Sequence, residues 1–162
     1  MNYQTNVSSN EETKKQSKEI KSKKEFNEKP TSAYIGASWG VVLIGLLSYC
    51  IGLWNATMLL NEKGYYFAIL LMGIYAVISL QKVIRDKAEN IKVSEMYYSI
   101  SWVIVISSLL LLIIGLRNAD LELSEKGFYA ISYLLSLFGA ITIQKNTRDI
   151  DFINTKTEEE NS

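Results

Sequence analysis

The chain has 162 residues, of which 17 are Lys or Arg and 17 are Asp or Glu, so its formal net charge is zero. None of these charges falls within residues 31–61, 64–81, 96–116 or 127–144. Uncharged runs near ~20 residues can cross the hydrocarbon core of a bilayer as helices, which excludes an ordinary soluble enzyme. The absence of His and the single Cys exclude the common zinc sites, an intrachain disulfide and a His-based catalytic dyad or triad.

Residues 1–30 form a segment rich in Lys and Glu, with many Asn, Ser and Thr. Its apolar side chains are too sparse to build a buried face, so we predict a disordered tail. The uncharged run that follows is longer than the apolar core of a secretory signal peptide. The first span is therefore expected to stay in the protein as an anchor.

Four transmembrane helices are expected, because an open strand could not satisfy its backbone groups in lipid. They cover Ala33–Trp54, Tyr65–Leu80, Met96–Leu116 and Phe128–Ile143. The second and fourth are short for a span. Asn61 and Ser124, each followed by Glu, predict N-caps that would lengthen these two helices at their starts.

The distribution of Lys and Arg predicts the orientation in the membrane. Fourteen of them lie in the N-terminal tail, the 82–95 loop and the C-terminal segment, against Lys63, Arg117 and Lys126 in the two remaining loops. Positive charge is enriched in cytoplasmic loops. We therefore expect both termini and the central loop in the cytoplasm.

An internal duplication organises the chain. A shift of 63 residues aligns 34–86 with 97–149 without a gap, and roughly two fifths of the aligned positions are identical. Each unit is a hairpin with an even number of spans, so the fold class expected is an all-α membrane protein with two parallel-oriented, repeated helical hairpins. The domains expected are the tail at 1–30, repeats at 33–90 and 96–150, and an acidic C-terminal tail at 151–162.

The segments that carry the repeat are "GLWNATMLLNEKGYYFAILLMGIYAVISLQKVIRD" and "GLRNADLELSEKGFYAISYLLSLFGAITIQKNTRD". They resemble the small bacterial inner-membrane proteins with the two-helix domain named after YiaA and YiaB. The resemblance implies a four-span protein of the bacterial inner membrane with two such domains. It implies no biochemical activity, and it provides no catalytic or ligand residue to transfer to this chain.

The loops between the spans of each hairpin share an outer motif. It could form a small polar site where the two loops meet, or each residue could serve only the helix ends: Asn in a left-handed turn, Glu at a helix start and Gly at a close approach. The candidate residues are Asn55, Glu62, Lys63, Gly64, Asn118, Glu125, Lys126 and Gly127.

An inner motif, Gln-Lys-x-x-Arg-Asp, ends both repeats. Its spacing predicts i,i+4 pairs of Gln with Arg and of Lys with Asp on one helix turn. Its basic groups could hold an anionic lipid head group, or they could serve only as a positive-inside anchor. The candidate residues are Gln81, Lys82, Arg85, Asp86, Gln144, Lys145, Arg148 and Asp149.

Small residues at four-residue spacing predict where helices approach closely in lipid. Such pairs include Gly36 with Gly40 and Ser48 with Gly52, and Ser132, Ser136 and Ala140 form a similar series. Packing within one chain and packing between chains are both compatible with this spacing.

No span carries an ionisable Asp, Glu, Lys, Arg or His in its interior, which disfavours an ion-coupled transporter. We expect a non-catalytic integral inner-membrane protein with no metal or cofactor, acting through helix packing, lipid contact or a membrane partner. The partners expected are membrane lipids, anionic ones included, and a second copy of the chain or another membrane protein, with no nucleic acid. The alternative is an oligomeric passive channel or uncoupled small-solute carrier lined by Ser48, Tyr49, Tyr75, Ser107, Ser108 and Tyr133.

Overall fold

The computed structural model describes residues 30–161 and divides the chain into two compact units. The larger one, Ala33–Lys145, is called the helical unit below. The described part of the other comprises residues 30–32 and 146–161. The tail predicted at 1–30 lies outside the described residues except for Pro30.

Four long helices make up the described chain, as the uncharged runs predict. They are α2 (Ser32–Asn55), α3 (Leu60–Ala88), α4 (Glu95–Asn118) and α5 (Leu123–Asn161). All four are long and apolar enough to cross a membrane. Only 22–39% of the most apolar part of each helix is buried, so most of the apolar surface faces outward, where lipid chains would cover it.

The helices α3 and α5 start earlier than the uncharged runs do, and their caps differ from the prediction. Asn61 and Ser124 lie inside the helices and not at the N-cap. The backbone N–H of Leu59 donates to the Glu62 carboxylate at 2.8 Å, and the N–H of Glu122 donates to Glu125 at 2.9 Å. Each carboxylate therefore accepts the backbone N–H of the residue three positions before it, at the positive end of the helix dipole.

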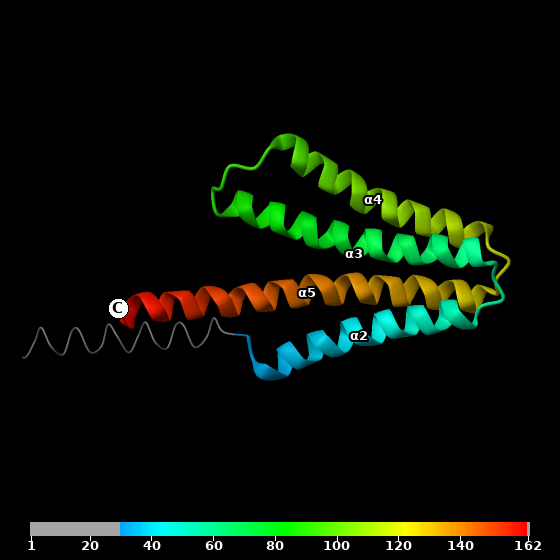
Figure 1. Ribbon diagram of the computed structural model, residues 1–162, viewed down its shortest axis with the longest axis horizontal. Helices are drawn as coiled ribbons and strands as arrows, with labels where there is room; N and C mark the ends of the chain where they lie inside the picture. Colours follow the sequence, from blue (N-terminus) through cyan, green and yellow to red (C-terminus); the bar gives the residue numbers. More distant parts are fainter. Residues whose placement is uncertain (1–29, 162) are drawn as a thin grey trace, which may run out of the picture. The chain divides into compact units, whose positions relative to one another are not determined.

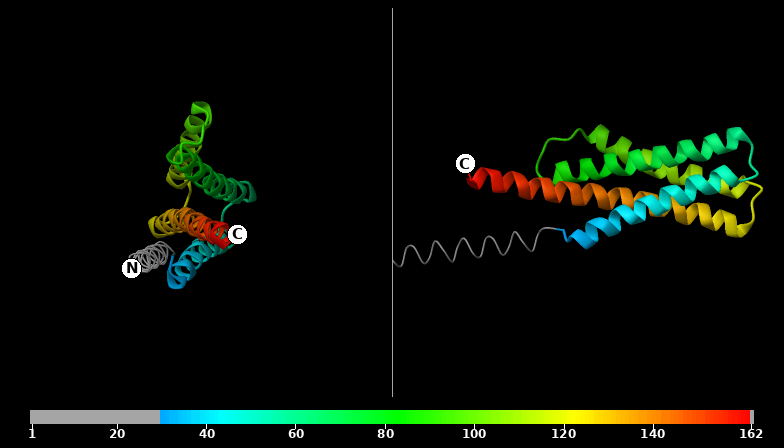
Figure 2. Two further views of the ribbon diagram at one scale, coloured as in Figure 1. Left: turned by 90° about the vertical axis from the view of Figure 1, so that its left-hand side faces the viewer. Right: turned by 60° about the horizontal axis from the view of Figure 1, so that its bottom comes forward.

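Figure 1 shows that α2 and α4 run in one direction within the helical unit and that α3 and α5 run in the other. The connections 56–59 and 119–122 therefore lie at one end, which we call the two-loop end. The connection 89–94 lies at the other end, the one-loop end, as the second view in Figure 2 also shows.

Contacts between the repeats follow the repeat symmetry. A Cβ placed on Gly52 of α2 would lie 2.6 Å from Phe128 of α5. A Cβ on Gly115 of α4, its repeat equivalent, would lie 2.7 Å from Tyr65 of α3, the equivalent of Phe128. Each repeat thus packs the end of its first helix against the start of the other repeat's second helix.

Small residues let these helices approach closely, but not all of those predicted. A Cβ on Gly45 would lie 2.7 Å from the backbone N of Ser136, and one on Gly139 would lie 2.7 Å from Val42. A Cβ on Gly36 or Gly40, in contrast, would meet nothing within 4 Å, so these two glycines make no close helix contact among the described residues of this chain. Their spacing alone does not say which face of α2 meets a neighbour.

The interior of the helical unit is filled by aromatic side chains. Tyr49 and Tyr133 are 0% exposed. The Tyr49 hydroxyl donates to the carbonyl oxygen of Tyr66 at 3.1 Å, and the Tyr49 ring meets that of Tyr129 edge-on with centroids 5.6 Å apart. Such ring contacts and a satisfied hydroxyl stabilise a buried tyrosine. These contacts join helices of both repeats.

Candidate functional site

The asparagines of the outer motif end their helices without a left-handed turn. The Asn55 side-chain amide donates to the Ile51 carbonyl at 3.0 Å, and Asn118 donates to Ile114 at 2.9 Å. Among the described non-glycine residues only Asn90 has a positive φ, of 58°. The prediction of left-handed Asn55 and Asn118 was therefore wrong, because each amide instead satisfies a carbonyl one turn back.

The remaining motif residues have different roles in the structure. Glu62 and Glu125 cap α3 and α5, and the Lys63 ammonium donates to the carbonyl of Trp54 at 2.9 Å. A Cβ on Gly64 or Gly127 would meet nothing within 4 Å. The close backbone approach predicted for these two glycines is absent from the described residues.

A pocket of about 430 Å³ lies at the two-loop end, between the start of α3 and the end of α4. It brings Glu62 of the first repeat together with Asn118 of the second. The residues that line it are Thr57, Met58, Asn61, Glu62, Tyr65, Tyr66, Gly115, Asn118, Ala119 and Asp120. The predicted polar site between the two loops thus has a counterpart here, formed by two of the eight motif residues.

The charged side chains of this pocket are all acidic. Glu62 and Asp120 contribute carboxylates, and no lining residue is basic. Asn118 uses its amide nitrogen to bond Ile114, which leaves its side-chain oxygen as an acceptor. We call this site the acidic pocket.

A second pocket, of about 600 Å³, lies between α2 and α3. Its lining is mostly apolar and includes Lys63 and Gly64 of the outer motif. The other lining residues are Cys50, Leu53, Trp54, Leu60 and Phe67. The eight residues of the outer motif therefore do not converge on one site, and Asn55, Glu125, Lys126 and Gly127 line neither pocket.

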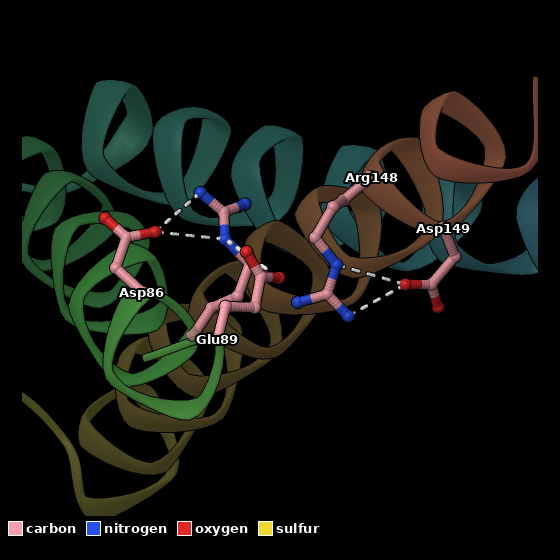
Figure 3. Close-up of polar contacts among 5 residues, drawn as sticks. Asp86, Glu89, Arg148 and Asp149 are labelled. Carbon is pink, nitrogen blue, oxygen red and sulfur yellow. Dashed lines mark hydrogen bonds and ion pairs between the residues drawn. The ribbon is translucent and has the colours of Figure 1, made fainter. Parts of the chain in front are cut away.

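The ion pairs of the inner motif differ from the i,i+4 pairs that its spacing predicts. Arg85 contacts its neighbour Asp86 at 3.0 Å and approaches Glu89 at 3.9 Å, and Arg148 contacts Asp149 at 2.8 Å (Figure 3). Each arginine uses two nitrogens on one carboxylate oxygen. The predicted i,i+4 pairs of Gln with Arg and of Lys with Asp were wrong for the described chain, because the adjacent acid captures the guanidinium.

The other motif residues differ in their surroundings. Gln144 of α5 donates to the Ile78 carbonyl of α3 at 3.2 Å, and Gln81 is half-buried. Lys82 and Lys145 are exposed and form no ion pair within the described part of the chain. Two positive charges of the inner motif are therefore free to act on their surroundings.

Asn61, Tyr65, Tyr66 and Asp120 line the acidic pocket but were missed as site residues. The predicted motif contains only residues that both repeats share. Asn61 aligns with Ser124 and Asp120 aligns with Thr57, so neither was included. A search for polar residues that differ between the repeats would have found Asn61 and Asp120.

Four apolar helices in two repeated hairpins, with outward apolar faces and charged groups at the helix ends, define a multi-pass membrane protein of the small helical-hairpin class. A family model described as the yiaA/B two helix domain matches residues 34–86 and 97–149. The chain belongs to this family and is a protein of the inner membrane.

Three membrane proteins show the similarity. The chain is 50% identical to the inner membrane protein YiaA of Escherichia coli (strain K12) over 117 residues, which cover 72% of this chain and 81% of YiaA. It is 28% identical to the inner membrane protein YiaB of the same organism over 104 residues, 62% of this chain and 86% of YiaB. It is 38% identical to the membrane protein YubF of Bacillus subtilis (strain 168) over 66 residues, 40% of this chain and 76% of YubF. No solved structure gives a significant match.

Proposed function

We propose that this protein is a non-catalytic component of the inner membrane that holds anionic lipid at the one-loop end of its helices. Both termini and the 89–94 connection face the cytoplasm in this proposal, because 14 of the 17 Lys and Arg residues lie on that side. The two-loop end then faces the opposite side of the membrane.

The observation that carries the proposal is the pair of free lysines. Lys82 follows the start of α3 by 22 residues, and Lys145 follows the start of α5 by the same number. At 1.5 Å per residue both lie roughly 33 Å along their helices, close to the ~30 Å thickness of the hydrocarbon core. This depth suits contact with lipid head groups.

Arg85 and Arg148 lie about one helix turn after the two lysines, but each has an acidic neighbour that neutralises its charge. Asp86 and Asp149 neutralise Arg85 and Arg148 locally. Each unneutralised basic group near an anionic surface contributes about 1 kcal/mol of attraction. Lys82 and Lys145 are therefore the groups of the inner motif that would attract lipid phosphate most.

The positions of the predicted pore-lining residues argue against the channel or carrier and favour a protein that acts through lipid contact. Tyr49, Ser108 and Tyr133 are 0% exposed in the packed interior, whereas Tyr75 is 66% exposed on the outside. Side chains in the packed interior and a side chain on the outer surface of the same chain do not line one continuous pore. We therefore put lipid contact before the channel or carrier.

The test compares two double variants of the full chain purified from the same membranes. Lys82→Gln with Lys145→Gln removes the two free charges, and Lys63→Gln with Lys126→Gln removes an equivalent pair at the two-loop end. Two groups at about 1 kcal/mol each predict roughly a 30-fold loss of anionic-lipid affinity in the first variant. Native mass spectrometry measures the bound lipid, and circular dichroism checks the fold. Identical lipid profiles in two well-folded preparations would reject the proposal.

A further inference from the structure

We propose that the acidic pocket binds an organic ammonium cation. This site lies at the two-loop end of the helical unit, so it is separate from Lys82 and Lys145 and does not depend on the lipid proposal. Its volume of about 430 Å³ falls in the range of small-molecule sites, ~300–1,000 Å³. The inference rests on the charge, the free acceptors and the aromatic walls of this pocket.

The charge of the lining is negative. Glu62 and Asp120 are the two ionisable acids of the pocket, and no lining side chain is basic. Lys63, the residue after Glu62, directs its ammonium to the carbonyl of Trp54. A cation that enters therefore meets two carboxylates without a competing positive group in the lining.

The Tyr66 hydroxyl is a second and independent indication of a ligand. Tyr66 is only 3% exposed, and no described residue makes a hydrogen bond to its hydroxyl. A Cβ on Gly115, which also lines the pocket, would lie 3.2 Å from this oxygen. The ring of Tyr66 is covered, but its hydroxyl is not among the buried unpaired atoms of the described residues, so it keeps an opening. Because Tyr66 lines the pocket, a ligand there can supply the hydrogen-bond partner that the protein does not.

The aromatic side chains of the pocket favour an organic ammonium over a metal ion. Tyr65 and Tyr66 both line the pocket, and their rings meet edge-on with centroids 5.4 Å apart. Tyr66 also stacks on Tyr129 with centroids 6.1 Å apart, whereas Tyr65 is 37% exposed, so Tyr65 is the ring that a ligand can reach. Ammonium groups are attracted to the faces of such rings. A bare metal ion would occupy a small part of the volume, and the described residues contain no group of three or more acidic, His or Cys side chains that could hold one.

The polar groups of the pocket are not explained by the repeated fold. Asn61, Tyr65 and Asp120 correspond to Ser124, Phe128 and Thr57 in the other repeat. The Tyr65 hydroxyl donates to the Leu111 carbonyl of α4 at 2.7 Å, so it contributes to packing between the repeats. Both repeats form the same helix ends and caps, so the Asn61 amide and the Asp120 carboxylate are not needed for the hairpin. They give the acidic pocket a chemistry that its repeat equivalent lacks.

An ammonium group can come from a soluble amine or from the head group of phosphatidylethanolamine. The first arm of the experiment titrates ethanolamine into the full-length protein in dodecyl maltoside, with ethylene glycol as the uncharged analogue. The second arm measures phosphatidylethanolamine bound to the protein in nanodiscs that also contain phosphatidylglycerol. Saturable binding in either arm identifies the source.

The matched variants are Glu62→Gln and Glu125→Gln. Both change an acid that caps a helix, but only Glu62 lines the acidic pocket. We expect about a tenfold loss of ammonium affinity for Glu62→Gln and for Asp120→Asn, since each loses a charge-assisted contact, and less than a twofold change for Glu125→Gln. Tyr66→Phe, which removes only the hydroxyl, should weaken binding about threefold.

Four results would overturn the inference. They are the absence of saturable binding in both arms, equal binding of ethylene glycol and ethanolamine, binding of Mg²⁺ without binding of the amine, and an equal loss in Glu62→Gln and Glu125→Gln. The variant with Lys82→Gln and Lys145→Gln should keep its ammonium affinity within twofold. Failure at the acidic pocket is thus distinguished from failure of the anionic-lipid proposal.

Discussion

The close approach of α2 and α5 at Gly139 supports a quantitative prediction. Gly139 is buried, and a Cβ added there would lie 2.7 Å from the N, Cα and Cβ atoms of Val42. Favourable contacts between carbon atoms lie at ~3.5–4.0 Å, so Gly139→Ala forces the helices apart by about 1 Å. Two of the three contacted atoms belong to the backbone, so no change of rotamer relieves the overlap.

The magnitude follows from two opposing terms. Overpacking of this kind costs about 1–3 kcal/mol of unfolding free energy, whereas Ala in place of Gly within a helix gains up to ~1 kcal/mol. Gly40→Ala is the matched control, because Gly40 lies in α2 and its added Cβ would meet nothing within 4 Å. The difference between the two variants isolates the overlap, and we expect Gly139→Ala to be the less stable by about 1–3 kcal/mol.

Equilibrium unfolding of the full chain in mixed detergent micelles measures this difference. Wild type, Gly40→Ala and Gly139→Ala are compared at one detergent composition, with helix content as the signal. Equal stability of the two variants would refute the close packing of α2 on α5. A stabilised Gly40→Ala together with a destabilised Gly139→Ala is the expected result.

Two further predictions concern topology and the aromatic core. On a Cys50→Ser background, a cysteine at Met58 should react with an impermeant thiol reagent in intact cells and one at Asn90 only after permeabilisation; the reverse pattern would overturn the proposed orientation. Tyr49→Phe loses the buried hydrogen bond to α3 and should lower the unfolding free energy by about 1 kcal/mol, whereas Tyr75→Phe, at a side chain that is 66% exposed, should change it little in the same unfolding assay.

The helix ends show how far local sequence reasoning reaches. The number of helices and their places in the chain follow from the uncharged runs, because lipid requires every backbone group to be satisfied internally. The second and fourth helices are longer than predicted, and α5 continues through the charged segment to Asn161. The predicted N-caps Asn61 and Ser124 lie two residues late, because α3 begins at Leu60 and α5 at Leu123. Glu62 and Glu125 accept the backbone N–H groups of Leu59 and Glu122 instead. Propensity favours Asn or Ser at the cap, whereas the N-cap of α3 is Leu59, whose own side chain cannot cap the helix.

What the sequence by itself determined about this protein is its four spans, its tandem hairpins and its family. These properties depend on composition along single helices and on a repeat that aligns without a gap. Only the tertiary structure decided which helix faces meet: Gly52 and Gly139 lie at contacts, whereas Gly36 and Gly40 face open space. In lipid no hydrophobic drive distinguishes one apolar face from another, so small residues alone do not specify a partner.

The acidic pocket was likewise decided by the tertiary structure. Glu62 and Asp120 belong to different repeats, and Asp120 stands at a position where the other repeat has Thr57. They line one pocket only because α4 ends beside the start of α3, where Gly115 lets the tyrosines of α3 approach. That proximity is a property of helix packing, because residues 58 positions apart in the chain have no local interaction that would bring them together.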